Sequence, residues 1–244
     1  MENAFLKAAR VYFSTLNLTV YFSIFILLAL VLLPLISSYV NVGGGFLRFS
    51  SFYLDFNMTQ FLLFAFVGAV SLLLLSFFLA AIISIVKLKE TLDHVKFTKA
   101  VATFPKYIKR LFCYLLLFSL ASLAVGVSFD YLGLPAFAAQ LIILLIWLIP
   151  AFTPQVIVLE DYGVIEALSD AVSFVKKQPM ALVTYFVLGT VLLFAMVLVE
   201  TSLGHYFIWE HKIVSIFVVS LFILPYTQMY ASELYVRRYA VSRV

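Results

Sequence analysis

Uncharged polar residues interrupt two otherwise apolar stretches and are the first candidates for a binding site. The stretch 137–159 ends with two prolines, a threonine and a glutamine, and the stretch 213–230 holds Pro225, a threonine and a glutamine. A proline in a helix frees a carbonyl oxygen, which a nearby threonine or glutamine can satisfy. One interpretation is a polar path for a substrate or lipid, lined by Gln140, Thr153, Gln155, Thr227 and Gln228. The other is kinked helices joined by hydrogen bonds, which is the ordinary arrangement in helix bundles.

Carboxylates follow three of the apolar stretches: Glu90, Glu160 and Glu233. They could coordinate a cation or contact a partner, or they could pair with basic neighbours, as Glu233 would with Arg237 one helical turn later. Asp161 is a candidate N-cap for the segment that follows it. No ionisable residue lies at the centre of an apolar stretch. This argues against a proton-coupled carrier and against a voltage sensor.

The chain lacks the residue patterns that are typical of enzymes. Glu200, His205, Glu210 and His211 could ligate zinc, but their spacing matches no reliable zinc motif. The single cysteine has no histidine nearby in the sequence, and the glycines at 43–45 are not followed by the lysine of a phosphate-binding loop. We therefore predict that the protein is not an enzyme and has no catalytic residues, metal or cofactor.

The composition of the chain predicts that the polar residues described above lie in or beside membrane-spanning helices. Hydrophobic residues make up 65% of the 244 residues, charged residues make up 11%, and the mean hydropathy is +1.13. A soluble domain is about 45–50% apolar and about 25% charged, so this chain requires a bilayer as its solvent. Six stretches are long enough to span it as helices. They are 20–39, 61–86, 111–128, 137–159, 180–199 and 213–230.

The distribution of basic residues indicates the orientation of these spans. If the N-terminus is inside, only Arg48 and Lys212 of the 16 lysines and arginines fall outside. Lysine and arginine are retained in cytoplasmic loops, so this bias predicts a cell-membrane protein with both termini cytoplasmic. A cleaved signal peptide over residues 1–40 is disfavoured because the apolar stretch there is too long.

Three segments on the cytoplasmic side have an amphipathic helical pattern: 3–17, 93–110 and 162–177. We predict that they lie in the membrane plane. Pro105 should break or kink the second segment, and Pro179 should end the third and start the next span. Each segment precedes a pair of spans, and Lys99-Ala100-Val101 recurs as Asp170-Ala171-Val172.

This order predicts an internal repeat of three hairpin units in the same orientation, at 1–90, 91–160 and 161–244. The predicted fold is therefore all-α. Residues 1–244 form one integral membrane domain, a polytopic bundle of six transmembrane helices with three in-plane amphipathic helices. The three-fold hairpin repeat is a hypothesis, because small apolar residues match easily by chance.

One stretch resembles a known family. The run from Pro154 to Glu160, then Gly163, Glu166-Ala167-Leu168, Ser173 and Lys176, is similar to a pattern in the membrane domain fused to some glycerophosphoryl diester phosphodiesterases. Related uncharacterised multi-pass bacterial and archaeal proteins share the pattern, which covers about residues 150–190 here. The resemblance implies a six-span bundle of unassigned role. The phosphodiesterase catalytic domain is absent, so its activity is not transferred.

Two classes of function remain open. The first is a non-enzymatic scaffold or accessory component that docks partners or anionic lipid head groups through Lys96, Lys99, Lys106, Lys109 and Arg110. Each basic residue near an anionic surface contributes about 1 kcal/mol of attraction. The second is a permease-like transporter or lipid-handling protein with its path between spans four and six. Expected partners are the lipid bilayer, anionic head groups and a membrane protein or second copy of the chain, with no nucleic acid.

Overall fold

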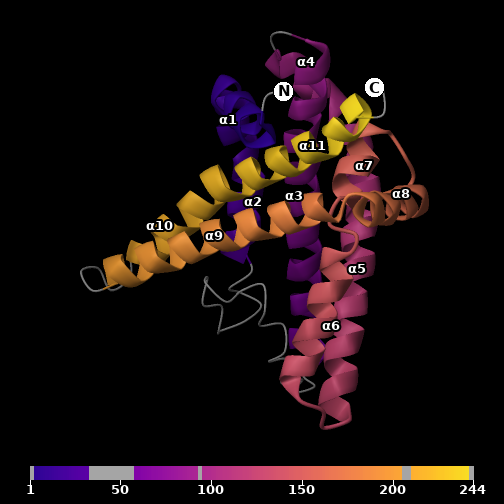
Figure 1. Ribbon diagram of the computed structural model, residues 1–244. Helices are drawn as coiled ribbons and strands as arrows, with labels where there is room; N and C mark the ends of the chain where they lie inside the picture. Colours follow the sequence, from indigo (N-terminus) through magenta and orange to yellow (C-terminus); the bar gives the residue numbers. More distant parts are fainter. Residues whose placement is uncertain (1–2, 33–57, 93–94, 205–209, 242–244) are drawn as a thin grey trace.

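The structure is a computed structural model that describes residues 3–32, 58–92, 95–204 and 210–241, and all its elements in these ranges are helices (Figure 1). The first group comprises α1 (Ala4–Ser14), α2 (Leu16–Leu32) and α3 (Met58–Thr91). The second comprises α4 (Phe97–Thr103), α5 (Pro105–Tyr131), α6 (Ala136–Leu148) and α7 (Thr153–Leu159). The third comprises α8 (Val164–Lys177), α9 (Pro179–Gly204), α10 (Glu210–Val218), the π-helix η3 (Val219–Ile223) and α11 (Leu224–Val241).

The predicted all-α membrane architecture is confirmed. Among the described residues, five helical segments are long and apolar enough to cross a membrane. The pair α1 and α2, which meet at an angle of 89°, supplies a sixth if it is taken as one broken span. The predicted span 20–39 is only partly described, because α2 ends at Leu32 and the following residues lie outside the described ranges.

Proline positions explain two helix starts, one of them differently from the prediction. Pro105 is the first residue of α5, where its missing N–H costs nothing and its fixed φ favours the helix. The predicted break of the segment 93–110 at Pro105 is confirmed, but the prediction that residues 105–110 are separate from the following span is wrong. Only Phe97–Thr103 forms a separate short helix, and Lys106, Lys109 and Arg110 belong to the long helix α5. Pro179 starts α9 directly after α8, as predicted.

The start of α8 corrects another prediction. Its N-cap is Gly163, whose N–H donates to the Glu166 carboxylate over 3.3 Å. Asp161, the predicted N-cap, lies two residues earlier and has a φ of 64°. This left-handed conformation turns the chain between α7 and α8, so the Asp161 side chain is directed to other partners.

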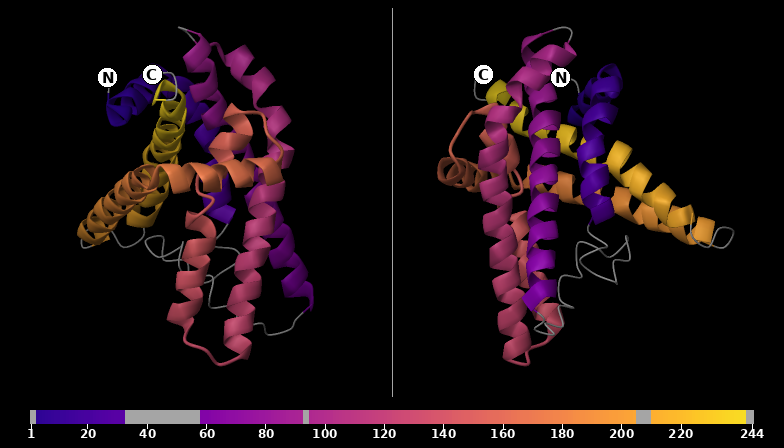
Figure 2. Two further views of the ribbon diagram at one scale, coloured as in Figure 1. Left: turned by 45° about the vertical axis from the view of Figure 1, so that its right-hand side comes forward. Right: turned by 180° about the vertical axis from the view of Figure 1, so that it is seen from behind.

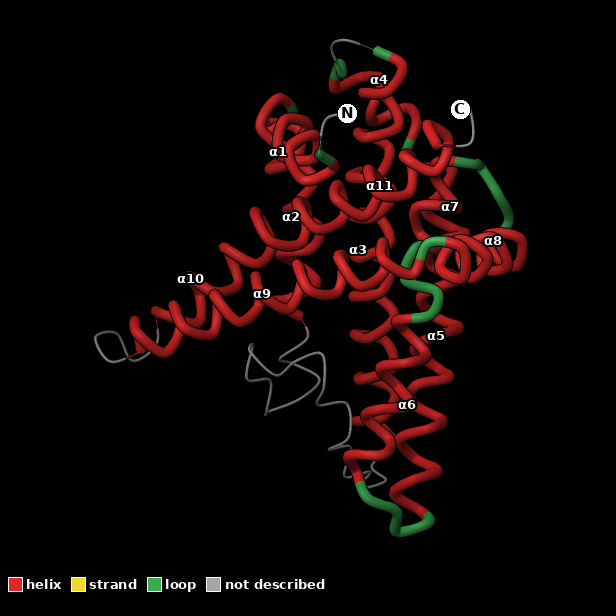
Figure 3. Tube along the Cα trace, in the orientation of Figure 1, coloured by secondary structure: helices red, strands yellow, loops and turns green. Residues whose placement is uncertain are grey.

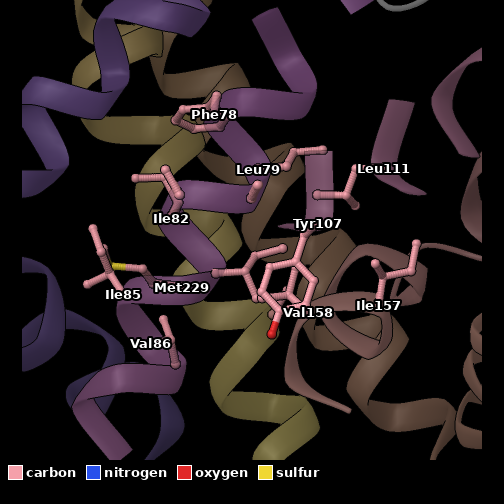
Figure 4. Close-up of a cluster of buried hydrophobic side chains, with 14 of the residues drawn as sticks. Phe78, Leu79, Ile82, Ile85, Val86, Tyr107, Leu111, Ile157, Val158 and Met229 are labelled. Atoms are coloured by element: carbon pink, nitrogen blue, oxygen red, sulfur yellow. The ribbon is translucent and has the colours of Figure 1, made fainter. Parts of the chain in front are cut away.

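The buried core centres on the second half of α3. Residues 78–83, 85 and 86 are apolar and at most 6% exposed. Figure 4 shows Ile82 and Val86 of α3 near Tyr107 of α5, Val158 of α7 and Met229 of α11. Four helices far apart in the sequence therefore share one core, and α3 is its central element.

The third group of helices lies across the first two. In Figures 1 and 2, α9 runs at a steep angle to α3, α5 and α6, which lie alongside one another. The connections between α5 and α6, α6 and α7, and α7 and α8 are short, as Figure 3 shows in green. A short helix precedes two longer helical segments three times in the described part of the chain. Because the third pair has a different inclination, the internal repeat stays a prediction.

Candidate functional site

A tyrosine from α5 closes the break between α6 and α7. Pro154 has no N–H, so the Pro150 carbonyl four residues earlier loses its usual helical donor. The Tyr114 hydroxyl donates to that oxygen over 3.3 Å, and the Thr153 N–H donates to it over 2.9 Å. The sequence suggested a threonine or glutamine side chain as the partner. The structure instead places a tyrosine from another helix there.

Pro225 in α11 has the same consequence and a similar solution. It leaves the Leu221 carbonyl without a helical donor, and the chain there forms the π-helix η3. The Tyr12 hydroxyl of α1 donates to this oxygen over 2.9 Å. Thr227, which the sequence analysis placed on a polar path, donates its hydroxyl to the Leu224 carbonyl of its own helix over 2.9 Å. The N-terminal helix α1 therefore stabilises an interruption near the other end of the chain.

Two of the predicted path residues meet in the interior. The Gln155 amide of α7 donates to the Gln228 side-chain oxygen of α11 over 3.0 Å. The Gln228 amide lies 3.4 Å from the Tyr185 hydroxyl of α9. Gln155 is fully buried, and its side-chain oxygen accepts no hydrogen bond from the described residues. The structure thus joins α7, α9 and α11 by uncharged polar contacts.

The other predicted path residues are less closely grouped. Thr153 is fully buried beside the break, at the start of α7. Gln140 is partly exposed and lies in α6, on the other side of the break. The polar path therefore stays a prediction, and its best-supported part is the Gln155–Gln228 contact.

Two of the three predicted carboxylates share one lysine. Lys7 of α1 forms ion pairs with Glu90 at the end of α3 and with Glu233 of α11, the latter at 2.9 Å. Glu233 is fully buried, whereas the Lys7 and Glu90 side chains are partly exposed. We call these three residues the Lys7 cluster. Lys7 is a partner of Glu233 from another helix, which the sequence did not indicate, and the pairing of Glu233 with Arg237 stays a prediction.

The third carboxylate belongs to a separate group. The Tyr235 hydroxyl of α11 lies 3.1 Å from the Glu160 carboxylate and 2.7 Å from that of Asp170 in α8. Tyr235 is fully buried, so this contact joins α8 and α11 below the surface. Among the described residues, no three metal-binding side chains gather in a group that could hold an ion. The side chains of the zinc candidates Glu200, His205, Glu210 and His211 lie outside the described part of the chain.

Two of the predicted basic residues hold Asp161. The Lys106 amino group lies 3.1 Å from one carboxylate oxygen, and the Arg110 guanidinium donates to the other over 2.7 Å. Arg110 also donates to the backbone oxygens of Asp161 and Tyr162, over 2.8 and 3.3 Å. We call Lys106, Arg110 and Asp161 the Asp161 clamp. The hydrogen bond from Lys106, with that from Arg110, lowers the pKa of Asp161 below its ordinary value.

The remaining predicted basic residues are exposed. Lys96 at the N-cap of α4, Lys99 of α4 and Lys109 of α5 have no ion-pair partner among the described residues. Lys87, which the sequence analysis did not single out, is instead engaged at the end of α3. It donates to the Tyr107 hydroxyl over 3.0 Å and to the Val158 carbonyl over 2.6 Å. Free lysines thus lie on α4 and the first turns of α5.

Sequence reasoning missed the tyrosines that join the helices. These tyrosines are next to apolar residues in the sequence, so they are interpreted as residues that only pack in the core. They are Tyr12, Tyr114, Tyr185 and Tyr235. Their hydroxyl partners lie between 36 and 209 residues away in the chain. A proline four residues after a freed carbonyl predicts that a donor is needed. It does not identify the helix that supplies the donor.

Comparisons with known proteins add no relative to this picture. No family model, no curated protein and no solved structure matches the chain. The resemblance of residues 150–190 to a phosphodiesterase-associated membrane domain therefore stays a prediction. Function is inferred from the geometry of the chain itself.

Proposed function

We propose that this multi-pass membrane protein is a non-enzymatic scaffold or accessory component that docks anionic lipid head groups, or a protein partner, at its basic end. The basic end comprises α1, α4, the first turns of α5 and the last turns of α11. The observation that carries the proposal is the exposure of Lys96, Lys99 and Lys109, which have no ion-pair partner among the described residues. The start of α1 and the end of α11 lie at this end of the molecule (Figure 1).

Side chains beside these lysines support a membrane-surface role. Phe97 and Val101 of α4 are exposed, and so is Phe13 of α1. Apolar and basic residues on one short helix are the combination that binds the boundary between head groups and acyl chains. We propose accordingly that α1, α4 and α8 lie in the plane of the cell membrane, with both termini cytoplasmic. Each free lysine then attracts anionic lipid by about 1 kcal/mol.

Charge reversal of the three free lysines tests this proposal. The triple variant K96E/K99E/K109E is compared with K96R/K99R/K109R, which keeps the charge at every position. Both are extracted gently from membranes, and the co-purifying lipids and proteins are identified by mass spectrometry. We expect the glutamate variant to insert normally and to lose the anionic lipid or the stoichiometric partner that the arginine variant retains. Equal recovery from both variants would contradict the proposal.

The contact between Gln155 and Gln228 favours a second candidate function. A permease-like or lipid-handling protein needs uncharged polar groups inside the bundle, and these two residues provide them between the predicted fourth and sixth spans. In a Cys113→Ser background, a path predicts that Gln228→Cys reacts with a membrane-impermeant thiol reagent. Ile157→Cys, at a fully buried apolar position of α7, is the unreactive control. If both cysteines stay unlabelled, the path interpretation fails.

A further inference from the structure

We propose that Lys106 and Arg110 form a binding site for the phosphate of an anionic glycerophospholipid, and that Asp161 occupies this site when the lipid is absent. The inference rests on the proposed docking function, and it adds the chemical group that binds and the residue that competes with it.

The two cations already hold an anion in a suitable geometry. They lie one turn apart on α5, and each contacts a different oxygen of the Asp161 carboxylate, at 3.1 and 2.7 Å. A carboxylate bridged in this way is the intramolecular equivalent of a phosphate with two of its oxygens bound. The planar guanidinium of Arg110 suits paired oxygens, and Lys106 adds a point charge.

Asp161 is held in a way that allows it to leave. It has a φ of 64°, and it is the one non-glycine residue with a positive φ in the described part of the chain. Its side chain is 46% exposed, so water and salt weaken its ion pairs. Arg110 would remain in place after the carboxylate left, because it also donates to the backbone oxygens of Asp161 and Tyr162.

The surroundings favour a lipid over a free phosphate ion. The site lies at the start of α5, a helix long and apolar enough to span a membrane. Tyr162 and Ile165 follow Asp161 in the chain and expose apolar surface, with Ile165 84% exposed. Lys109, on the same stretch of α5, is exposed as well. A ligand that contacts both the basic and the exposed apolar side chains has an anionic head and acyl chains.

Lipid titration of the purified full chain tests the inference. Binding of phosphatidylglycerol and of phosphatidylcholine with the same acyl chains is measured in neutral detergent by native mass spectrometry. We expect Asp161→Asn to bind phosphatidylglycerol about two- to fivefold more tightly than the wild type, because it removes a weak exposed competitor. Asp161→Gly should behave alike, since glycine also suits a positive φ. Binding of phosphatidylcholine should not change.

Matched variants test whether the gain in affinity arises at this site or from a general change in charge. Asp130→Asn makes the same change at the other end of α5, where Asp130 is exposed, and should leave both affinities unchanged. The pair K106Q/R110Q should remove the gain produced by Asp161→Asn. The inference is overturned if both Asp161 variants bind like the wild type, if Asp130→Asn gives the same gain, or if the gain survives K106Q/R110Q.

Two further results distinguish the inference from the proposed function. Displacement of phosphatidylglycerol from Asp161→Asn by millimolar inorganic phosphate would overturn the lipid as ligand and indicate a free phosphate site. A phosphatidylglycerol preference that depends on Lys96, Lys99 and Lys109, but not on Asp161, would overturn this inference and leave the docking function intact. If neither the wild type nor any variant prefers phosphatidylglycerol, both this inference and the proposed docking of anionic lipid are overturned.

Discussion

The Lys7 cluster and the Asp161 clamp use the same chemistry at the same end of the molecule, but they differ in burial. Each contains an ion pair between a lysine and a carboxylate, at 2.9 Å for Lys7 and Glu233 and at 3.1 Å for Lys106 and Asp161. Glu233 is fully buried, whereas every side chain of the clamp is more than a third exposed. Exposed pairs stabilise by about 0–1 kcal/mol, and breaking a buried pair costs about 3–5 kcal/mol. Burial, rather than distance, therefore separates a structural contact from an exchangeable one.

The largest effect is expected when Lys7 is removed. Lys7→Met leaves the buried Glu233 carboxylate without the lysine that neutralises it, so the free energy of unfolding should fall by about 3 kcal/mol. The value lies at the low end of the range because the Lys7 side chain is 34% exposed. Unfolding in mixed micelles would measure it. Lys99→Met, at an exposed lysine of α4, should change stability by less than about 0.5 kcal/mol. Equal effects of the two variants would contradict the comparison.

A double variant tests whether Lys7 stabilises the protein through Glu233. Glu233→Gln removes the buried charge itself, so in the Lys7→Met background it should restore part of the lost stability. The coupling between the two positions should be about 1–3 kcal/mol in a double-mutant cycle measured by the same unfolding assay. If the two losses simply add, Lys7 does not act through Glu233.

An intermediate effect is expected for the uncharged contact made by the same helix. Tyr12→Phe keeps the ring but removes the hydroxyl that donates to the Leu221 carbonyl, and it should lower stability by about 1 kcal/mol. Tyr21→Phe, at an exposed ring on α2, is the matched control and should be neutral within about 0.5 kcal/mol. A neutral Tyr12→Phe would mean that charge alone holds α1 in place.

The smallest effect on stability is expected at the Asp161 clamp, and it should depend on pH. The pKa of Asp161 is lowered from its ordinary 3.8, chiefly by Lys106. A lowered folded-state pKa gives stability that is complete above the unfolded value and is lost as the pH falls through the folded one. The melting temperature of Asp161→Asn should therefore lie slightly below that of the wild type at pH 7, and the difference should vanish once the pH falls below the lowered pKa of Asp161. A difference that persists in acid would contradict this.

Much of the fold follows from the sequence, because hydropathy and the residues that start or end helices are local properties. The stretches at 61–86, 111–128, 180–199 and 213–230 lie within continuous helical segments, and the stretch 137–159 is a span broken between α6 and α7. Hydropathy does not indicate which helix faces protein and which faces lipid. The apolar residues of α3 are largely buried, whereas Met180, Val187 and Phe194 of α9 are exposed. At 93–110 the proline indicated a break or a kink, but it did not indicate that the residues after it continue into the following span.

The site was less predictable, because its contacts join distant segments. Glu90 and Glu233 are recognisable as carboxylates near the membrane surface, but no local pattern indicates that Lys7 serves both. Asp161 resembles an N-cap by residue type and position, and only the positive φ of the folded chain directs it toward α5. Gln155 and Gln228 were predicted to line one polar path, but their direct hydrogen bond was not part of that prediction.

The hydrogen bond between Tyr12 and Leu221 has a consequence for biosynthesis. The two residues are separated by 209 positions, so at about 5–20 residues per second the ribosome makes Leu221 about 10–40 s after Tyr12. Lys7 likewise waits for Glu233. During that interval α1 lacks its contacts with α11, although Glu90 at the end of α3 is already available to pair with Lys7. Helix α1 therefore completes its packing only after α11 has been made, and ribosomes that stall before η3 would release chains in which α1 lacks its contact with Leu221.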